Sequence, residues 1–162
     1  MIKQAVEKSI NDQINAELYS AYLYLSMSSY FESKNLGGFA HWMTVQAKEE
    51  VNHAMKFYGY INERGGRVTL KAIDSPPVNW KSPLDVLENV YKHEVKVTGL
   101  INKLVNLARS EKDVATENFL MWYIDEQVEE EASADAIVQK LKLIKDSANG
   151  LFMLDHELAQ RE

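Results

Sequence analysis

The sequence predicts an all-α protein: a bundle of four long helices with one long crossover between helices two and three, and a short fifth helix. Four segments carry an apolar stripe with the ~3.6-residue spacing of a helix. Between the second and third of them, residues 66–82 lack such a stripe, and all three prolines fall in or just after this segment. The 162 residues suffice for one domain, residues 1–162, with a sizeable core.

The first helix is expected over about residues 4–34. Ile10, Glu17 and Tyr24 stand seven residues apart, which is close to two helical turns, so they share one line of the helix. A single acid thus interrupts an apolar stripe. The helix should end at residues 35–38, because Asn and Gly there accept the left-handed backbone of a helix C-terminus.

The second helix should span about residues 38–64 and run antiparallel to the first, because so short a link joins them. Glu50 stands seven residues from both Met43 and Phe57, on one apolar line. His53 is three residues further on and shares that face. A carboxylate and an imidazole therefore point together into the expected core, where charges are normally paired or bound to a metal.

Residues 66–82 form a connection that is long for a compact domain. At ~3.3 Å per residue, an extended chain of this length can run the whole ~40 Å of the preceding helix. We interpret the segment, which includes Pro76-Pro77, as a crossover that lets the second and third helices run parallel. A mobile lid is the alternative.

The third helix has a strong start, with Ser82 as N-cap, Pro83 in the first position and Asp85 in the first turn. Its apolar line is interrupted by one acid, Glu94.

The fourth helix begins after Asp113, and its apolar line is likewise interrupted by one acid, Glu130. It should end near residues 147–150, and a short fifth helix should follow over about 151–160. One side of that last helix carries three leucines, which we expect to be buried against other copies of the chain: Leu151, Leu154 and Leu158.

Each long helix thus carries one acid in its apolar stripe near mid-helix: Glu17, Glu50, Glu94 and Glu130. One such acid is ordinarily a residue at the edge of the stripe, but four at matching heights would require four coincidences. Four unpaired carboxylates repel one another, and divalent cations relieve that repulsion. With the imidazole of His53 they match a pair of metal ions in an oxygen-rich site, which suits iron, with manganese and zinc as competitors.

Composition narrows the chemistry further. The chain has no cysteine, which excludes disulfides, zinc-thiolate sites and cysteine-bound iron–sulfur clusters. Its net charge of -6 argues against nucleic acid as a partner and suits the attraction of cations. No apolar run has the length of a signal peptide or a membrane span, so we expect no membrane partner and a cytoplasmic location.

Several motifs resemble bacterial and archaeal non-haem ferritins, and the similarity extends over essentially the whole chain. They are residues 13–20 (QINAELYS), 49–53 (EEVNH), 91–94 (YKHE), 118–131 and 151–158. The resemblance implies a di-iron ferroxidase centre within each subunit. It implies oxidation of Fe(II) by O2 or hydrogen peroxide and storage of ferric oxyhydroxide in a hollow shell of 24 identical subunits.

The resemblance also implies a role for each matching residue. The first iron would be held by Glu17, Glu50 and His53, and Glu50 would bridge to the second iron. The residues of the second iron would be Glu94, Glu130 and, close by, Gln127. Tyr24 matches the tyrosine beside the centre, which can hydrogen-bond and supply an electron. A third iron site, sharing Glu130, would use three further acids: Glu49, Glu126 and Glu129.

Two departures separate the chain from neighbouring families. Bacterioferritins carry a second Glu-x-x-His pair, but the matching positions here hold Gln127 and Glu130. They also bind haem through a Met just after the bridging Glu, where this chain has Val51, so we expect no haem.

Two alternative functions are open: a non-storing di-metal oxidase such as a rubrerythrin, and an assembly that binds cations passively. Three histidines are expected to be surface or locally hydrogen-bonded residues without a role: His41, His93 and His156.

Overall fold

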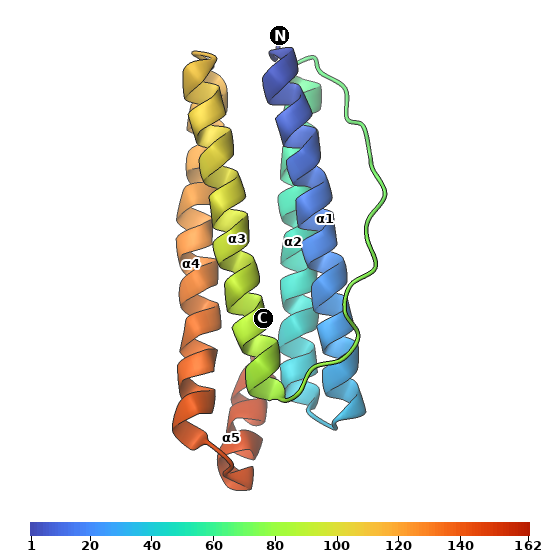
Figure 1. Ribbon diagram of the computed structural model, residues 1–162, viewed down its shortest axis with the longest axis vertical. Helices are drawn as coiled ribbons and strands as arrows, with labels where there is room; N and C mark the ends of the chain where they lie inside the picture. Colours follow the sequence, from blue (N-terminus) through green and yellow to red (C-terminus); the bar gives the residue numbers. More distant parts are fainter.

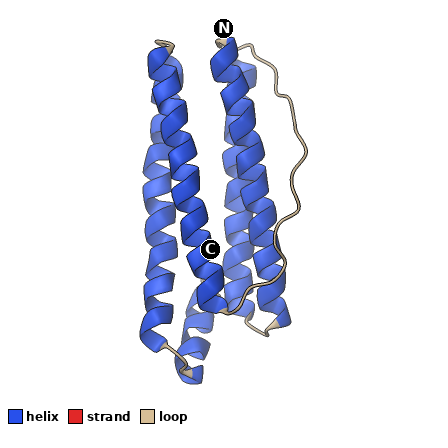
Figure 2. Cartoon of the chain, in the orientation of Figure 1, coloured by secondary structure: helices blue, strands red, loops and turns tan.

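The computed structural model describes residues 1–162 and contains five helices and no strand (Figure 2). Four long helices form the bundle: α1 (Gln4–Ser33), α2 (Gly37–Glu63), α3 (Pro83–Ser110) and α4 (Val114–Ile144). The short α5 (Ala148–Leu158) lies at one end of the bundle, beside the turn between α1 and α2 (Figure 1). The expected all-α fold, with its crossover and its fifth helix, is confirmed.

Local chemistry sets the helix ends. Asn35 has a φ of 57° and turns the chain from α1 into α2, as the sequence predicts. Ser82 caps α3, and its Oγ accepts a hydrogen bond from the Asp85 backbone N–H at 3.1 Å. Asp113 caps α4 in the same way, accepting from the Thr116 backbone N–H at 3.1 Å. These caps make the third and fourth helices start where the sequence places them.

The segment between α2 and α3 runs the length of the bundle along α1, so that α2 and α3 are parallel (Figure 1). Polar side chains of α1 hold it at intervals. Asn11 Oδ1 accepts from the Thr69 backbone N–H at 2.7 Å, and Ser26 Oγ donates to the Pro77 carbonyl at 2.6 Å. Between them, Asn15 donates to the Ala72 carbonyl at 3.0 Å. These bonds satisfy an extended backbone and favour the crossover over the lid.

The boundary between the last two helices differs from the expectation. The periodic pattern placed the end of the fourth helix near residues 147–150, but α4 ends at Ile144 and α5 begins at Ala148. Ser147 is the N-cap of α5, and its Oγ accepts from the Gly150 backbone N–H at 3.1 Å. Ser147, which the sequence pattern places at the end of the fourth helix, is therefore the first residue of the α5 cap.

The leucine side of α5 also differs from the expectation. Leu154 and Leu158 are buried within a single chain, in the same apolar cluster as Phe39 and Trp42 of α2, and Leu151 packs beside them. The expected burial of this side against other copies is wrong, because the end of the four-helix bundle is open and α5 covers it. The side of α5 left free carries two apolar side chains that are more than 70% exposed: Phe152 and Met153.

The core consists of two apolar clusters, one near each end of the bundle. The cluster nearer α5 contains Met27, Phe31 and Phe39, and the other contains Phe57 and Leu120. A layer of buried polar side chains lies between them. None of the helices combines the length and the apolar character needed to span a membrane.

Candidate metal centre

Four buried carboxylates, one from each long helix, make up most of the polar layer: Glu17 from α1, Glu50 from α2, Glu94 from α3 and Glu130 from α4. None is more than 6% exposed. They lie close enough for mutual repulsion to act on their titration. His53 and Gln127, predicted from the same helix faces, are buried with them. The sequence pattern therefore brings these six side chains to one place.

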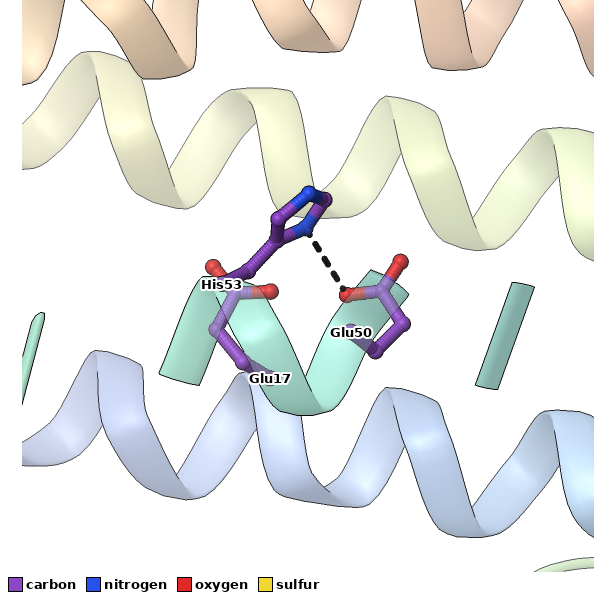
Figure 3. Close-up of side chains that lie close together, drawn as sticks. All are labelled: Glu17, Glu50 and His53. Atoms are coloured by element: carbon purple, nitrogen blue, oxygen red, sulfur yellow. Dashed lines mark ion pairs between the residues drawn. The ribbon is translucent and has the colours of Figure 1, made fainter. Parts of the chain in front are cut away.

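Glu17, Glu50 and His53 form the tightest group, with ligand atoms that all lie within 4.8 Å of one another (Figure 3). His53 Nδ1 is 3.5 Å from Glu50 Oε2. Glu17 Oε1 accepts from Gln13 Nε2 at 2.9 Å, but its Oε2 is buried without any hydrogen-bond partner. An unpaired buried carboxylate oxygen is costly, and a cation held between these three residues would satisfy it.

Glu94 is held by hydrogen bonds on both oxygens. The Tyr24 hydroxyl donates to Oε1, and Gln127 Nε2 donates to Oε2 at 3.1 Å. Burial raises the pKa of Tyr24 well above its ordinary value, so the phenol keeps its proton and its donor role. The structure therefore places Tyr24 and Gln127 on either side of one carboxylate, where both orient it.

Glu130 belongs to a second group with His53 and Glu126, whose ligand atoms also lie within 4.8 Å of one another. His53 Nε2 is 3.5 Å from Glu126 Oε1 while its other nitrogen faces Glu50. Gln46 Nε2 donates to Glu130 Oε2. The two nitrogens of one imidazole thus link the two groups.

Burial raises the pKa of all four carboxyl groups of the layer. The pKa reaches about 7 for Glu94 and for Glu130. The pKa of Glu50 rises well above its ordinary value, because repulsion from the three other carboxylates adds to burial. Protons therefore neutralise part of this cluster when no cation is near, and a cation binds here by displacing protons.

The three acids expected at a third site have different surroundings. Glu126 is half-buried and lies beside His53 and Glu130. Glu49 is half-buried, close enough to Glu130 to raise its pKa, and paired with Arg161. Glu129 is exposed and makes no hydrogen bond or ion pair. The structure therefore gathers two of the three beside Glu130.

Sequence reasoning missed two residues that touch the polar layer. Gln46 stands four residues before Glu50, on the same face of α2, so its place in the helical pattern was a usable signal. Arg161 lies beyond the last helix, where no periodicity predicts its position. His93 proves to be locally hydrogen-bonded, with its Nε2 2.7 Å from Ser20 Oγ. Burial lowers the pKa of His93 to about 4, so the ring is neutral beside Tyr24.

Comparison with known proteins gives this arrangement its context. The Ferritin-like domain family matches residues 7–144. The bacterial non-heme ferritin of Bacteroides fragilis is 47% identical over 161 residues, which cover 99% of this chain and 100% of that protein. The chain belongs to the ferritin family. The resemblance to non-haem ferritins noted in the sequence is thereby confirmed.

Other ferritins agree with this assignment. A ferritin of Campylobacter jejuni is 45% identical over 155 residues, covering 96% of this chain and 93% of its own length. The open-pore ferritin of the archaeon Archaeoglobus fulgidus is 56% identical and matches with a TM-score of 0.99, covering 99% of this chain and 98% of its own. The similarity therefore includes the crossover and α5 as well as the four long helices.

Proposed function

We propose that this protein is an iron-storage ferritin with ferroxidase activity. It oxidises Fe(II) with O2 or hydrogen peroxide at a di-iron centre inside each subunit, and stores the product as ferric oxyhydroxide in a hollow shell of 24 subunits. The observation that carries the proposal is the layer of four buried carboxylates and one imidazole, with an oxygen of Glu17 left unpartnered. Iron is both substrate and cargo.

In this proposal the first iron binds Glu17, Glu50 and His53, the group whose ligand atoms are already close together. Glu50 bridges to a second iron, which also binds Glu94 and Glu130. Carboxylate oxygens together with an imidazole nitrogen suit non-haem iron. The carboxylates release protons as the two cations bind, which removes the repulsion between them.

Tyr24 and Gln127 act on the second iron through Glu94. Both donate hydrogen bonds to this carboxylate and hold the direction of its lone pairs. Tyr24 is also the side chain able to supply an electron to the reaction, because its phenol contacts a ligand directly. Gln127 supplies an amide N–H to Glu94 and stands where bacterioferritins carry the Glu of their second Glu-x-x-His pair, while Glu130 stands where they carry its imidazole.

A third iron site lies next to the di-iron centre and uses Glu49, Glu126 and Glu129 with a share of Glu130. The nearness of Glu126 and Glu49 to Glu130 supports this assignment.

The proposed reaction uses no haem. The chain works as a single domain, residues 1–162, in the cytoplasm, with iron, the oxidant and its own copies as partners.

Aerobic addition of Fe(II) to the metal-free protein tests this proposal. We expect ferric absorbance to rise far faster than in buffer, and the iron to sediment with a large protein particle. Fast oxidation without retained iron would instead identify a non-storing di-metal oxidase. Retained iron without faster oxidation would identify an assembly that binds cations passively.

A further inference from the structure

The chain beyond α5 turns back over α2 and ends beside the polar layer. The backbone carbonyl of Arg161 accepts from His41 Nε2 at 2.7 Å. The Arg161 guanidinium lies 4.5 Å from the centre of the Trp42 ring, which holds it against the helix. This tail is therefore held against the first turns of α2, with the guanidinium directed toward Gln46 and Glu49.

The two ends of the guanidinium fork bind two different side chains. Nη2 is 2.5 Å from Glu49 Oε2, and Nη1 donates to Gln46 Oε1 at 2.7 Å. Gln46 is fully buried and donates its own N–H to Glu130. Because the amide oxygen of Gln46 is occupied by Arg161, its nitrogen must face Glu130. Arg161 thus sets the position of two carboxylates, one directly and one through an amide.

Glu49 and Glu130 are two of the acids of the proposed third iron site. A cation at that site needs the oxygens that the Arg161 system now occupies. The guanidinium is a permanent positive charge that cannot give up a proton to make room, so it can leave only by moving. Arg161 lies beyond α5, which ends at Leu158, so moving its side chain breaks no hydrogen bond within a helix.

We propose that Arg161 is a built-in counter-ion of the third site: it holds Glu49 and Glu130 while the site is empty and is displaced when a metal cation binds. Arg161 is a positioning residue, which sets the affinity of the third site relative to the two sites of the di-iron centre. The proposal rests on the third site of the proposed function. It makes the third ion bind after the other two, because only the third must displace an internal cation.

Zinc binding to the assembled, metal-free protein tests the proposal without any redox step. Calorimetry should resolve, after the di-iron positions, a weaker event that Glu49→Gln removes. In Arg161→Gln this event should be about three- to fivefold tighter, the effect of removing a competing ion pair that is partly exposed to solvent. A chain shortened by residues 161–162 should behave like Arg161→Gln. Arg109→Gln, which breaks the surface pair with Glu117, is the matched control and should change nothing.

The possible results separate this inference from the third site itself. A weaker event that stays at wild-type affinity, or weakens, in Arg161→Gln overturns the counter-ion role and leaves the third site standing. Absence of any Glu49-dependent event in both proteins removes the third site and the counter-ion role together. Both results are independent of the di-iron centre, whose zinc binding is measured in the same titration.

Trp42 gives a second readout, because the guanidinium rests on its ring. In a variant whose other two tryptophans are replaced, Trp80→Phe with Trp122→Phe, zinc beyond the first two equivalents should shift the Trp42 emission. The same background carrying Arg161→Gln should show no shift. An identical shift in both proteins would mean that the tail stays in place, and would overturn the proposal.

Discussion

Each of the four buried carboxyl groups in the polar layer lowers the free energy of unfolding of the metal-free protein, and the apolar packing of the rest of the fold must offset that loss. Each of the four carboxyl groups has a raised pKa, with burial as the largest cause. The metal-free folded chain therefore keeps protons that the unfolded chain would release. An internal cation site made in this way is unstable when empty at neutral pH, and that instability favours the binding of metal.

The stability of the metal-free protein should depend on pH for this reason. A carboxyl group with a raised folded pKa stabilises the fold below its ordinary pKa of about 4.5, and that stability is lost as pH rises through the folded value. For Glu94 and Glu130 that value is about 7. We expect the free energy of unfolding of the metal-free protein to decrease by on the order of a few kcal/mol as the pH is raised from 4.5 to 7. The thermal midpoint should decrease with it. A midpoint that stays level or rises over this range would contradict the assigned pKa shifts.

Replacing the proposed bridge should separate stability from activity. Glu50→Ala removes one of four buried carboxyl groups whose ionisation is opposed by burial and by mutual repulsion, so the metal-free protein should be at least as stable as the wild type. Fast Fe(II) oxidation should be lost. His53→Ala should lose the activity in the same way. Stopped-flow absorbance and thermal unfolding measure the two effects. Wild-type oxidation rates in Glu50→Ala would show that the centre lies elsewhere.

The acids beside the centre should change the course of the reaction rather than its existence. Glu49→Ala combined with Glu126→Ala removes two carboxylates near Glu130. The group of Glu17, Glu50 and His53 stays intact. We expect the first irons to be oxidised normally, with a changed ratio of iron oxidised to O2 consumed and slower later turnovers. Oxygen-electrode measurements give the ratio. A double variant indistinguishable from the wild type would make these acids an ordinary solvated surface.

The sequence was most informative at those residues that interrupt a regular pattern. Glu17, Glu50 and Glu94 each stand in an apolar line, so helix geometry alone brings them into one layer. Arg161 follows no such line, because it lies in a tail whose path is set by contacts with Trp42 and Gln46. Its position therefore depends on tertiary structure that no local spacing encodes.

At the scale of elements, the start of α4 is fixed by more than a cap. Asp113 accepts from the Thr116 backbone N–H and also receives both Nη atoms of Arg64 of α2, each at 3.2 Å. Asp113→Ala should cost about 2–4 kcal/mol, because it removes a cap and leaves a partly buried guanidinium unpaired. Ser82→Ala, which removes only a cap, should cost about 1 kcal/mol. Chemical denaturation compares them, and equal losses would show that the Arg64 contact adds nothing.

The elements also show where helical periodicity stops being sufficient. The long helices could be placed within a few residues, because their stripes extend over many turns. The junction of α4 and α5 could not, since Ser147 and Gly150 fit both a helix end and a helix start. The tertiary contact that decides is the docking of Leu154 and Leu158 on the open end of the bundle, which holds α5 where a new cap is needed.

At the scale of the whole molecule, the docking of α5 changes the reason for expecting a shell. Its leucine side is satisfied within one chain, so it does not require other copies. The free side presents Phe152 and Met153 to solvent, and the faces of α1 and α2 expose further apolar side chains: Tyr22, Leu25, Val51, Met55 and Tyr58. Apolar surface at two separate places on one chain is suited to an assembly in which each subunit contacts several neighbours.

We therefore expect the purified protein to sediment at modest salt as one closed particle of about 440 kDa, the mass of 24 chains of 18.5 kDa. Phe152→Glu should shift it toward smaller species, because it places a charge on the exposed apolar side of α5 that we expect to contact other copies. Leu154→Ala should instead lower thermal stability, since Leu154 is buried within the chain. A wild-type particle of one or two chains that still oxidises Fe(II) would exclude storage and leave a di-metal oxidase. A large particle unaffected by Phe152→Glu would keep the shell but move its contacts away from α5, to the exposed faces of α1 and α2.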